Sequence, residues 1–134
     1  MANNMDVHVA NIMIPGTLAS DIAYPLLHVP ANGGAITLLE AQYTVGTAML
    51  AGSVNLYYGT LSAAGGTCVP DVCVATSIGT GGGTFPPLSP VTLNLGLVPC
   101  VIPANNWLSV IVGTAPDAAQ QFVTLAYVLG RQAS

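Results

Sequence analysis

The sequence predicts an all-β protein built as a two-sheet antiparallel β-sandwich. Helical periodicity is nearly absent, and short runs rich in Val, Ile, Leu, Tyr and Thr recur between clusters of Gly, Pro and Asn, the pattern of a sandwich or barrel. Apolar and polar side chains alternate clearly in VTLNLGL, residues 91 to 97, as expected of a strand with one buried face. The 134 residues suffice for one domain with a single core. The number of strands suits an immunoglobulin-like or a jelly-roll sandwich.

Seven strands follow from these runs, and an eighth candidate precedes them. They are Ile22 to Val29, Ala35 to Val45, Ser53 to Gly59, Val72 to Ser77, Val91 to Leu97, Trp107 to Gly113 and Gln121 to Leu129, and the further candidate is Val7 to Ile14. The last of the seven is apolar on both alternating faces. We therefore expect one of its faces in the core and the other under a covering layer, either the amino-terminal arm or a neighbouring subunit.

Residues 1 to 21 are predicted to form an extended amino-terminal arm, and residues 22 to 134 the sandwich domain. The arm contains VHVANIMIPG, whose alternating apolar side chains could add a strand to the sheet edge of a neighbour. The same segment could equally be the first strand of its own sandwich, and the two interpretations coexist if the strand is exchanged. Residues 79 to 87, rich in Gly and Pro, are predicted to form a surface loop of the kind that often contacts partners.

The tripeptide Pro-Ala-Asn occurs at residues 30 to 32 and again at 103 to 105, each time just before an apolar run. Proline fixes φ and has no N–H, so it fits the approach to a strand, where no hydrogen-bond donor is needed. Asn and Gly then allow positive φ. Both copies are interpreted as corners that lead the chain into a strand, and two unrelated proline turns are the alternative.

Charged side chains are nearly missing. The chain has five acids, no lysine and one base, Arg131, while 52% of its residues are hydrophobic; soluble domains usually have about a quarter of their residues charged. We infer that much of the surface meets other protein. Nucleic acid is not an expected partner, because phosphate binding needs several cations, and an anionic membrane surface is disfavoured for the same reason. Prolines and asparagines interrupt the most apolar stretch, residues 91 to 113, which argues against a transmembrane span.

The amino terminus lacks the basic and apolar regions of an export signal, so we expect synthesis and assembly in a cytoplasm. The three cysteines are an odd number and do not fit a disulfide framework. Cys68 and Cys73 flank a Pro70-Asp71 turn and could close a small loop on oxidation. Reduced, buried thiols are the favoured interpretation.

No pattern in the chain indicates catalysis, a metal or a cofactor. GTGGGT, residues 79 to 84, is not followed by Lys and Ser or Thr, so it is not a phosphate-binding loop. Neither histidine lies near a cysteine in sequence, and the cysteines lack the second close pair typical of zinc sites. Glu40 is the only acid inside a predicted strand; it is either solvated or paired with Arg131. We predict that the protein is not an enzyme and needs no cofactor.

Three segments, VPANGGAITLLEAQYTVGTAM, VIPANNWLSVIVGT and VTLAYVLG, together with the Gly/Pro-rich loop and the arm, resemble the small structural proteins of tailed bacteriophages. They are most similar to capsid decoration, or cement, proteins. The resemblance implies a jelly-roll sandwich that forms a homotrimer on the outside of an icosahedral head, assembled in the host cytoplasm, and clamps subunits of the major capsid protein. The residues expected to contact the capsid or another subunit are Val7, Val9, Ile12, Ile14, Phe85, Tyr58 and Arg131.

Three other functions remain open at this stage. A tail, fibre or minor head component belongs to the same structural class. A carbohydrate-binding or host-adhesion module would need an exposed Trp107 or Tyr58, although such residues more often pack between sheets or at subunit contacts. A small hydrolase or isomerase on a cupin-like barrel would need a cluster of histidines, and the chain has two.

Overall fold

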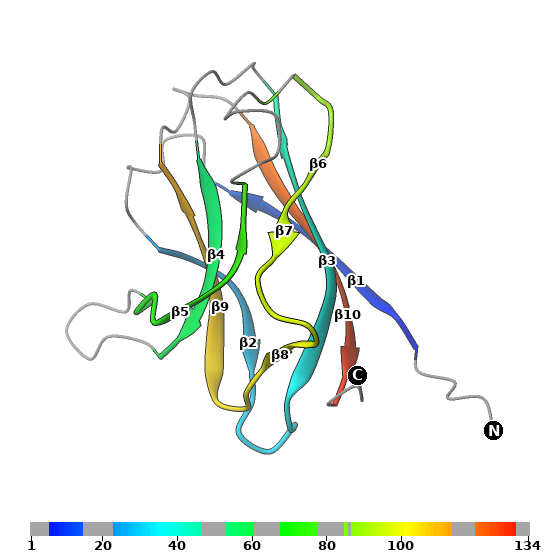
Figure 1. Cartoon of the computed structure of the whole chain (residues 1–134), viewed down its shortest axis with the longest axis vertical. Helices are drawn as coiled ribbons and strands as arrows, with labels where there is room; N and C mark the ends of the chain where they lie inside the picture. The colour runs from blue at the N-terminus through cyan, green and yellow to red at the C-terminus, as the bar shows by residue number, and fades with distance from the viewer. Residues whose placement is uncertain are drawn as a thin grey trace.

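Two antiparallel sheets packed face to face form the protein, and no helix occurs among its described residues (Figure 1). The structure is a computed structural model that describes residues 6–14, 23–46, 53–60, 68–77, 85, 87–113 and 120–130. The predicted all-β sandwich is confirmed.

Sheet A has the order β1-β10-β3-β6, with β8 also paired to β3, and sheet B has the order β2-β9-β4-β5-β7. The strands are β1 (His8–Ile14), β2 (Tyr24–Val29), β3 (Ile36–Val45), β4 (Val54–Gly59), β5 (Val72–Thr76), β6 (Val91–Thr92), β7 (Asn94–Leu95), β8 (Cys100–Ile102), β9 (Asn106–Val112) and β10 (Gln121–Leu129). Most bounds lie within one or two residues of the predicted runs.

The strands pair from the ends of the chain inwards. β1 pairs with β10, β2 with β9, β3 with β8, and β4 with β5, all antiparallel. Successive pairs alternate between sheet A and sheet B, as if one long hairpin were wrapped around a common core. Nested pairing of this kind is the topology of a jelly roll.

Residues His8–Ile14 form a strand that pairs within their own chain. β1 pairs with β10 along its whole length, from His8 opposite Tyr127 to Ile14 opposite Gln121, and runs along the side of sheet A (Figure 1). Of the two interpretations of this segment, the structure therefore shows the strand in its own sandwich. The other residues of the predicted arm, 1–5 and 15–21, lie outside the described residues.

The predicted strand from Val91 to Leu97 is wrong, because the chain changes sheets within it. β6 pairs with β3 in sheet A, whereas β7 pairs with β5 in sheet B. Leu93 lies between them, 2% exposed, and its N–H donates to the Ala41 carbonyl at 2.8 Å. In sequence, the alternation of apolar and polar residues in this crossing segment is the same as that of a continuous strand, which explains the wrong prediction. The short β8, enclosed by Pro99 and Pro103, was not predicted.

A β-bulge in β3 changes which residues face the core. Ile36 and Leu38 point inward at one end, and Ala41, Tyr43 and Val45 do so at the other. The change of phase occurs where the pairing with β10 passes from Glu40 to Leu38 and leaves Leu39 without an opposite residue. Both Leu39 and Glu40 are therefore exposed. Glu40 thus lies at the surface, as the solvated interpretation expects, and Arg131 lies outside the described residues.

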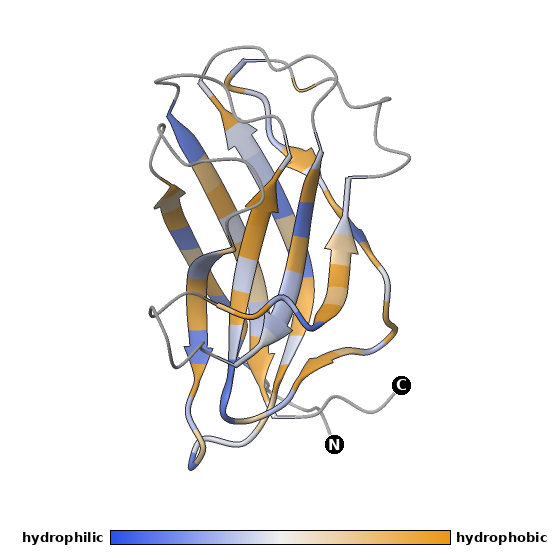
Figure 2. Ribbon diagram, turned by 90° about the vertical axis from the view of Figure 1, so that its left-hand side faces the viewer, coloured by the Kyte–Doolittle hydropathy of each residue, from blue (hydrophilic) through white to orange (hydrophobic). Residues whose placement is uncertain are grey.

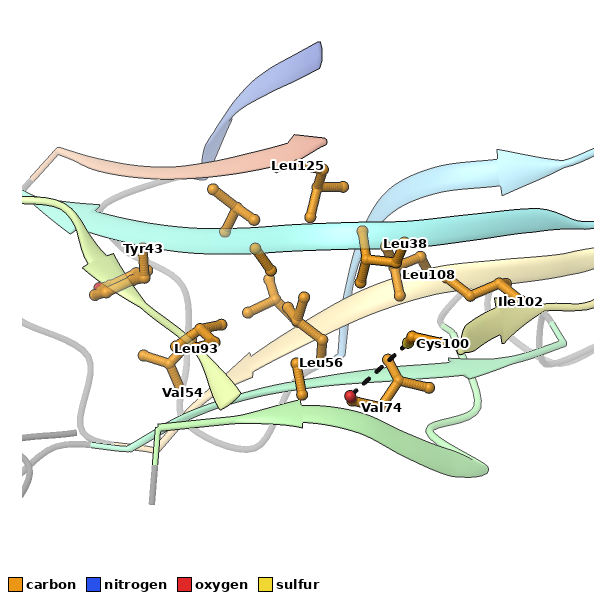
Figure 3. Packing of buried hydrophobic residues seen from close by; sticks show 14 of the residues in the cluster. Leu38, Tyr43, Val54, Leu56, Val74, Leu93, Cys100, Ile102, Leu108 and Leu125 are labelled. Atoms are coloured by element: carbon orange, nitrogen blue, oxygen red, sulfur yellow. Dashed lines mark hydrogen bonds between the residues drawn. The ribbon is translucent and has the colours of Figure 1, made fainter. Parts of the chain in front are cut away.

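The core lies between the sheets and joins residues far apart in sequence (Figure 3). Leu38 and Leu125 from sheet A approach Leu56 and Leu108 from sheet B. Every buried side-chain nitrogen or oxygen atom of the described residues has a hydrogen-bond partner. Polar groups inside this core are therefore satisfied, as a stable interior requires.

Phe85 is part of this core, which corrects its prediction as a contact residue of a surface loop. It is 1% exposed and meets Tyr43 edge to face, with ring centroids 5.2 Å apart. Pro87 at the end of the predicted loop is exposed, and residues 79–84 and 86 lie outside the described residues.

Both Pro-Ala-Asn copies are corners between the sheets, as predicted. The first joins β2 to β3, and the second joins β8 to β9. They lie side by side, because the Asn105 N–H donates to the Val29 carbonyl at 2.7 Å. Asn105 adopts a positive φ of 63° in the second copy, whereas Gly34, two residues after the first, adopts 74°.

Candidate functional site

Among the described strands that lie at the edges of the two sheets, β1 is the one without protection against pairing. β2 contains Pro25 and a register shift, while β6 and β7 have two residues each and β8 has three. Proline, irregularity and shortness are common ways in which proteins block sheet edges. β1 has seven residues, HVANIMI, with neither proline nor a charged side chain.

Apolar side chains stand on the outer face of this edge strand. Val9 is 67% exposed and Met13 is 60% exposed, and Val7, just before the strand, is 56% exposed. Ile12 is half-buried against the core, and Ile14 is 1% exposed within it. Two of the four predicted contact residues in this segment are therefore at the surface, and the other two face the interior.

The outer face of sheet A carries an uncharged row of polar side chains, here called the polar row: Asn11, Thr124, Gln42 and Thr92. The register places these residues opposite one another across β1, β10, β3 and β6. The Thr124 hydroxyl donates to Asn11 Oδ1 at 3.2 Å, and Gln42 Nε2 donates to Thr92 Oγ1 at 3.4 Å.

An open hollow of about 190 Å³ lies beside the polar row, lined by Asn11, Thr44, Phe122 and Thr124. Phe122 and Thr124, which line it, are partly exposed, and so is Ala126 farther along β10. The outer side of β10, predicted to lie under a covering layer, is thus still partly open to contact in this region.

The outer face of sheet B is turned to the viewer in Figure 2. Part of this face carries the rings of His28, Trp107 and Tyr57. The rings of His28 and Trp107 stack with centroids 4.5 Å apart. Tyr57 is half-buried on the same face; burial raises its pKa, and neighbouring Cys73 raises it further. Adjacent Tyr58 packs against the core, so Tyr57 rather than the predicted contact residue Tyr58 faces outward.

The three cysteines are free thiols with two different environments. Cys68 and Cys100 are buried, and burial raises the pKa of the Cys100 thiol to about 11, which suppresses its reactivity. Cys73 is exposed, which corrects the expectation that Cys68 and Cys73 are both buried. Its strand position on the outer face of sheet B explains the difference.

The histidines and the other possible metal ligands of the described residues do not gather in one place. No group of three His, Cys, Asp or Glu side chains in the described part of the chain gathers as a metal site. His8 stacks on Tyr127 at 5.5 Å and His28 on Trp107, so both imidazoles contact aromatic rings. No helix in the described ranges is long and apolar enough to cross a membrane.

The sequence interpretation missed Asn11 and Met13, which share the outer face of β1 with Val9. The alternation of side chains along a strand could have predicted this, because it places residues 9, 11 and 13 on one face and residues 10, 12 and 14 on the other. It also missed Val98, 90% exposed in the turn between β7 and β8. Arg131, the remaining predicted contact residue, lies outside the described residues.

Comparison with protein-family models, curated proteins and solved structures found no match. The functional conclusion therefore depends on the jelly-roll fold, on the unprotected edge of β1 and on the surface composition.

Proposed function

We propose that the protein is a structural component of a virus particle. It decorates the outer surface of a tailed-phage capsid as an oligomer and stabilises the assembled shell. In this function it acts by binding alone and has no catalytic residues.

One observation supports this proposal above the others: the described surface has many exposed apolar side chains and few charges. Nine large hydrophobic residues are exposed, including Val9, Leu88 and Val98. The charged residues in the same part of the chain are Asp6, Glu40 and Asp71, all acids. An isolated soluble protein usually has a strongly charged surface, and exposed apolar surface typically marks a contact with protein.

Several of the exposed apolar residues lie in two separate regions that suit two kinds of contact. One is the edge strand β1 with Val9 and Met13, and the other is the turn that contains Leu97 and Val98. A decoration protein needs one surface for its own copies and another for the shell. Burial of either region stabilises the assembly by roughly 25 cal/mol per Å² of apolar surface removed from water.

The mechanism of stabilisation is mass action. A protein that binds the assembled shell more tightly than dissociated subunits adds its binding free energy to the stability of the shell. Copies that are joined to one another bind with an increased effective concentration, so modest contacts are sufficient. Because few charges are involved, we expect this binding to depend weakly on salt.

Co-sedimentation tests the proposal directly. Purified protein is mixed with heads of the phage whose genome encodes this chain, prepared without it, and centrifuged in low and physiological salt. We expect saturable binding in both buffers, with a higher temperature of shell disruption when the sites are filled. Absence of the protein from the head pellet, or its complete loss at physiological salt, would contradict the proposal.

The His28–Trp107 stack favours carbohydrate binding as a second candidate function. Trp107 lies on the outer face of sheet B, opposite Gly59, and aromatic rings on flat surfaces suit stacking against sugars. A glycan array with the wild type and with Trp107→Ala tests this function. Binding that is lost in the variant would favour an adhesion module over capsid decoration.

A further inference from the structure

We propose that β1 of one molecule pairs antiparallel with β1 of a second copy, so that two A sheets join across a two-fold axis at Asn11. This inference rests on the proposed function, which requires an oligomer, and it names the surface and the partner. A two-fold contact produces dimers or other even-numbered assemblies, in contrast to the homotrimer that the family resemblance implies.

The backbone of β1 provides the main attraction. β1 ends the described order of sheet A and pairs with β10 on one side. Along the other side, its N–H and C=O groups point away from the sheet, and a further strand can bind them. None of the residues His8–Ile14 is an Asp, Glu, Lys or Arg that would oppose the approach of an identical strand.

The side chains select one register for this pairing. Opposite residues of paired strands must lie on the same face, so an outward residue has to meet another outward residue. Placing Asn11 opposite Asn11 uses all seven residues of the strand. It brings Val9 of one copy against Met13 of the other, so that exposed apolar side chains, 67% and 60% exposed in the single chain, cover each other.

Neighbouring registers fit less well. A shift of one residue would place outward side chains opposite inward ones, which a continuous sheet excludes. A shift of two residues keeps the faces but sets Asn11 against Val9 or against Met13. Both choices oppose an amide to an apolar side chain and pair fewer residues of β1 with one another than the register centred on Asn11 does.

The same register continues the polar row across the two-fold axis. Asn11 and Thr124 are already linked at 3.2 Å within one chain. Two rows that meet at the paired Asn11 amides form one uncharged band of hydrogen-bonding side chains over both A sheets. Val9 and Met13 flank the axis on either side of this band.

The size of the contact predicts its strength. Stable protein interfaces bury at least about 1,200 Å² in total, and a pair of seven-residue strands covers less than that. We therefore expect a dimer that dissociates on dilution in solution and that neighbouring contacts on a shell would reinforce.

The test measures the mass of the purified full chain by light scattering over a wide dilution range. Asn11→Lys places two like charges opposite each other at the axis, while Thr92→Lys puts the same charge on the far edge of the polar row. Both positions are exposed in β1 and β6. We expect Asn11→Lys to raise the dissociation constant about tenfold or more and Thr92→Lys to leave it within about twofold. An equimolar mixture of Asn11→Lys and Asn11→Glu should recover the dimer, which shows that both variants are folded.

Four results would overturn the inference: a wild-type monomer at every concentration, a trimer, an assembly unaffected by Asn11→Lys, or equal effects of the two lysine variants. Co-sedimentation with phage heads, measured in parallel, tests the proposed function independently of dimer formation. A protein that dimerises through β1 but does not bind heads would contradict the proposed function alone. A monomeric wild type that binds heads would contradict this inference alone.

Discussion

The hydrogen bond between Tyr43 and Gln121 allows a direct test of how polar groups stabilise the core. Both residues are fully buried, and the Tyr43 hydroxyl donates to Gln121 Oε1 at 2.6 Å. Tyr43→Phe removes this donor and keeps the ring, so the edge-to-face contact with Phe85 can persist. Loss of one partner in a buried hydrogen bond costs about 1–3 kcal/mol, and we expect about 1.5 kcal/mol here because the rest of the packing is conserved.

The expected change in melting temperature follows from the size of the chain. An unfolding entropy of about 2.1 cal/mol/K per residue gives about 0.28 kcal/mol/K for 134 residues. A loss of about 1.5 kcal/mol therefore lowers Tm by about 5 °C. The measurement is differential scanning calorimetry at one fixed protein concentration, because association would itself shift Tm.

A double-mutant cycle with Gln121→Met assigns the effect to the pair. If the hydrogen bond is responsible, the double variant should be more stable than the sum of the two single losses predicts, by about 1 kcal/mol. A Tm for Tyr43→Phe within about 1 °C of the wild type would refute the reasoning. Additive losses in the cycle would refute it as well.

Three further predictions concern the backbone and the buried thiol. Gly59→Ala should destabilise by about 3 kcal/mol or more, because its Cβ would overlap the Val69 carbonyl oxygen, whereas Gly96→Ala, with 3.8 Å to the nearest atom, should cost under about 1 kcal/mol in urea unfolding. Asn105→Val should cost about 1–2 kcal/mol at a positive φ of 63°, and Asn105→Gly little. The buried Cys100 thiol has its pKa raised from 9.0 to about 11. As pH rises, the thiol therefore ionises in the unfolded chain before it ionises in the folded protein. The contribution of the buried neutral thiol to the free energy of unfolding is complete below pH 9. It is lost as pH rises towards 11, with a slope of up to about 1.4 kcal/mol per pH unit. Cys100→Ala should flatten this decline, and an unchanged pH profile between 9 and 11 would contradict the assignment.

Local patterns were sufficient for most strands but not for the places where the chain changes sheets. Gln121–Leu129 was predicted with its correct bounds, because its apolar run is long and closed by Gly130. Residues 91 to 97 have an equally regular pattern, yet they cross from sheet A to sheet B at Leu93. Burial from two sides keeps Leu93 inside during the crossing, and alternation in sequence cannot distinguish this from a continuous strand.

The predicted contact residues of β1 fall into exposed and buried ones, and the sequence could not separate them for a related physical reason. Val9 and Ile14 both appear apolar in an alternating run, but they have opposite parity, so one faces solvent and the other the core. The bulge at Leu39 similarly reverses the inward phase of β3 without any glycine or proline to mark it. Which parity is inward depends on the partner strand, and this information is not local.

The sequence by itself determined that the protein is an all-β sandwich, that its two Pro-Ala-Asn segments are corners and that its surface has few charges. These properties follow from period-two patterning, from the fixed φ of proline and from composition. The tertiary structure alone decided the nested order of the strands, the burial of Phe85 against Tyr43 and the position of β1 at an unprotected edge. All three depend on which segments meet across tens of residues, because pairing and packing are contacts between distant parts of the chain.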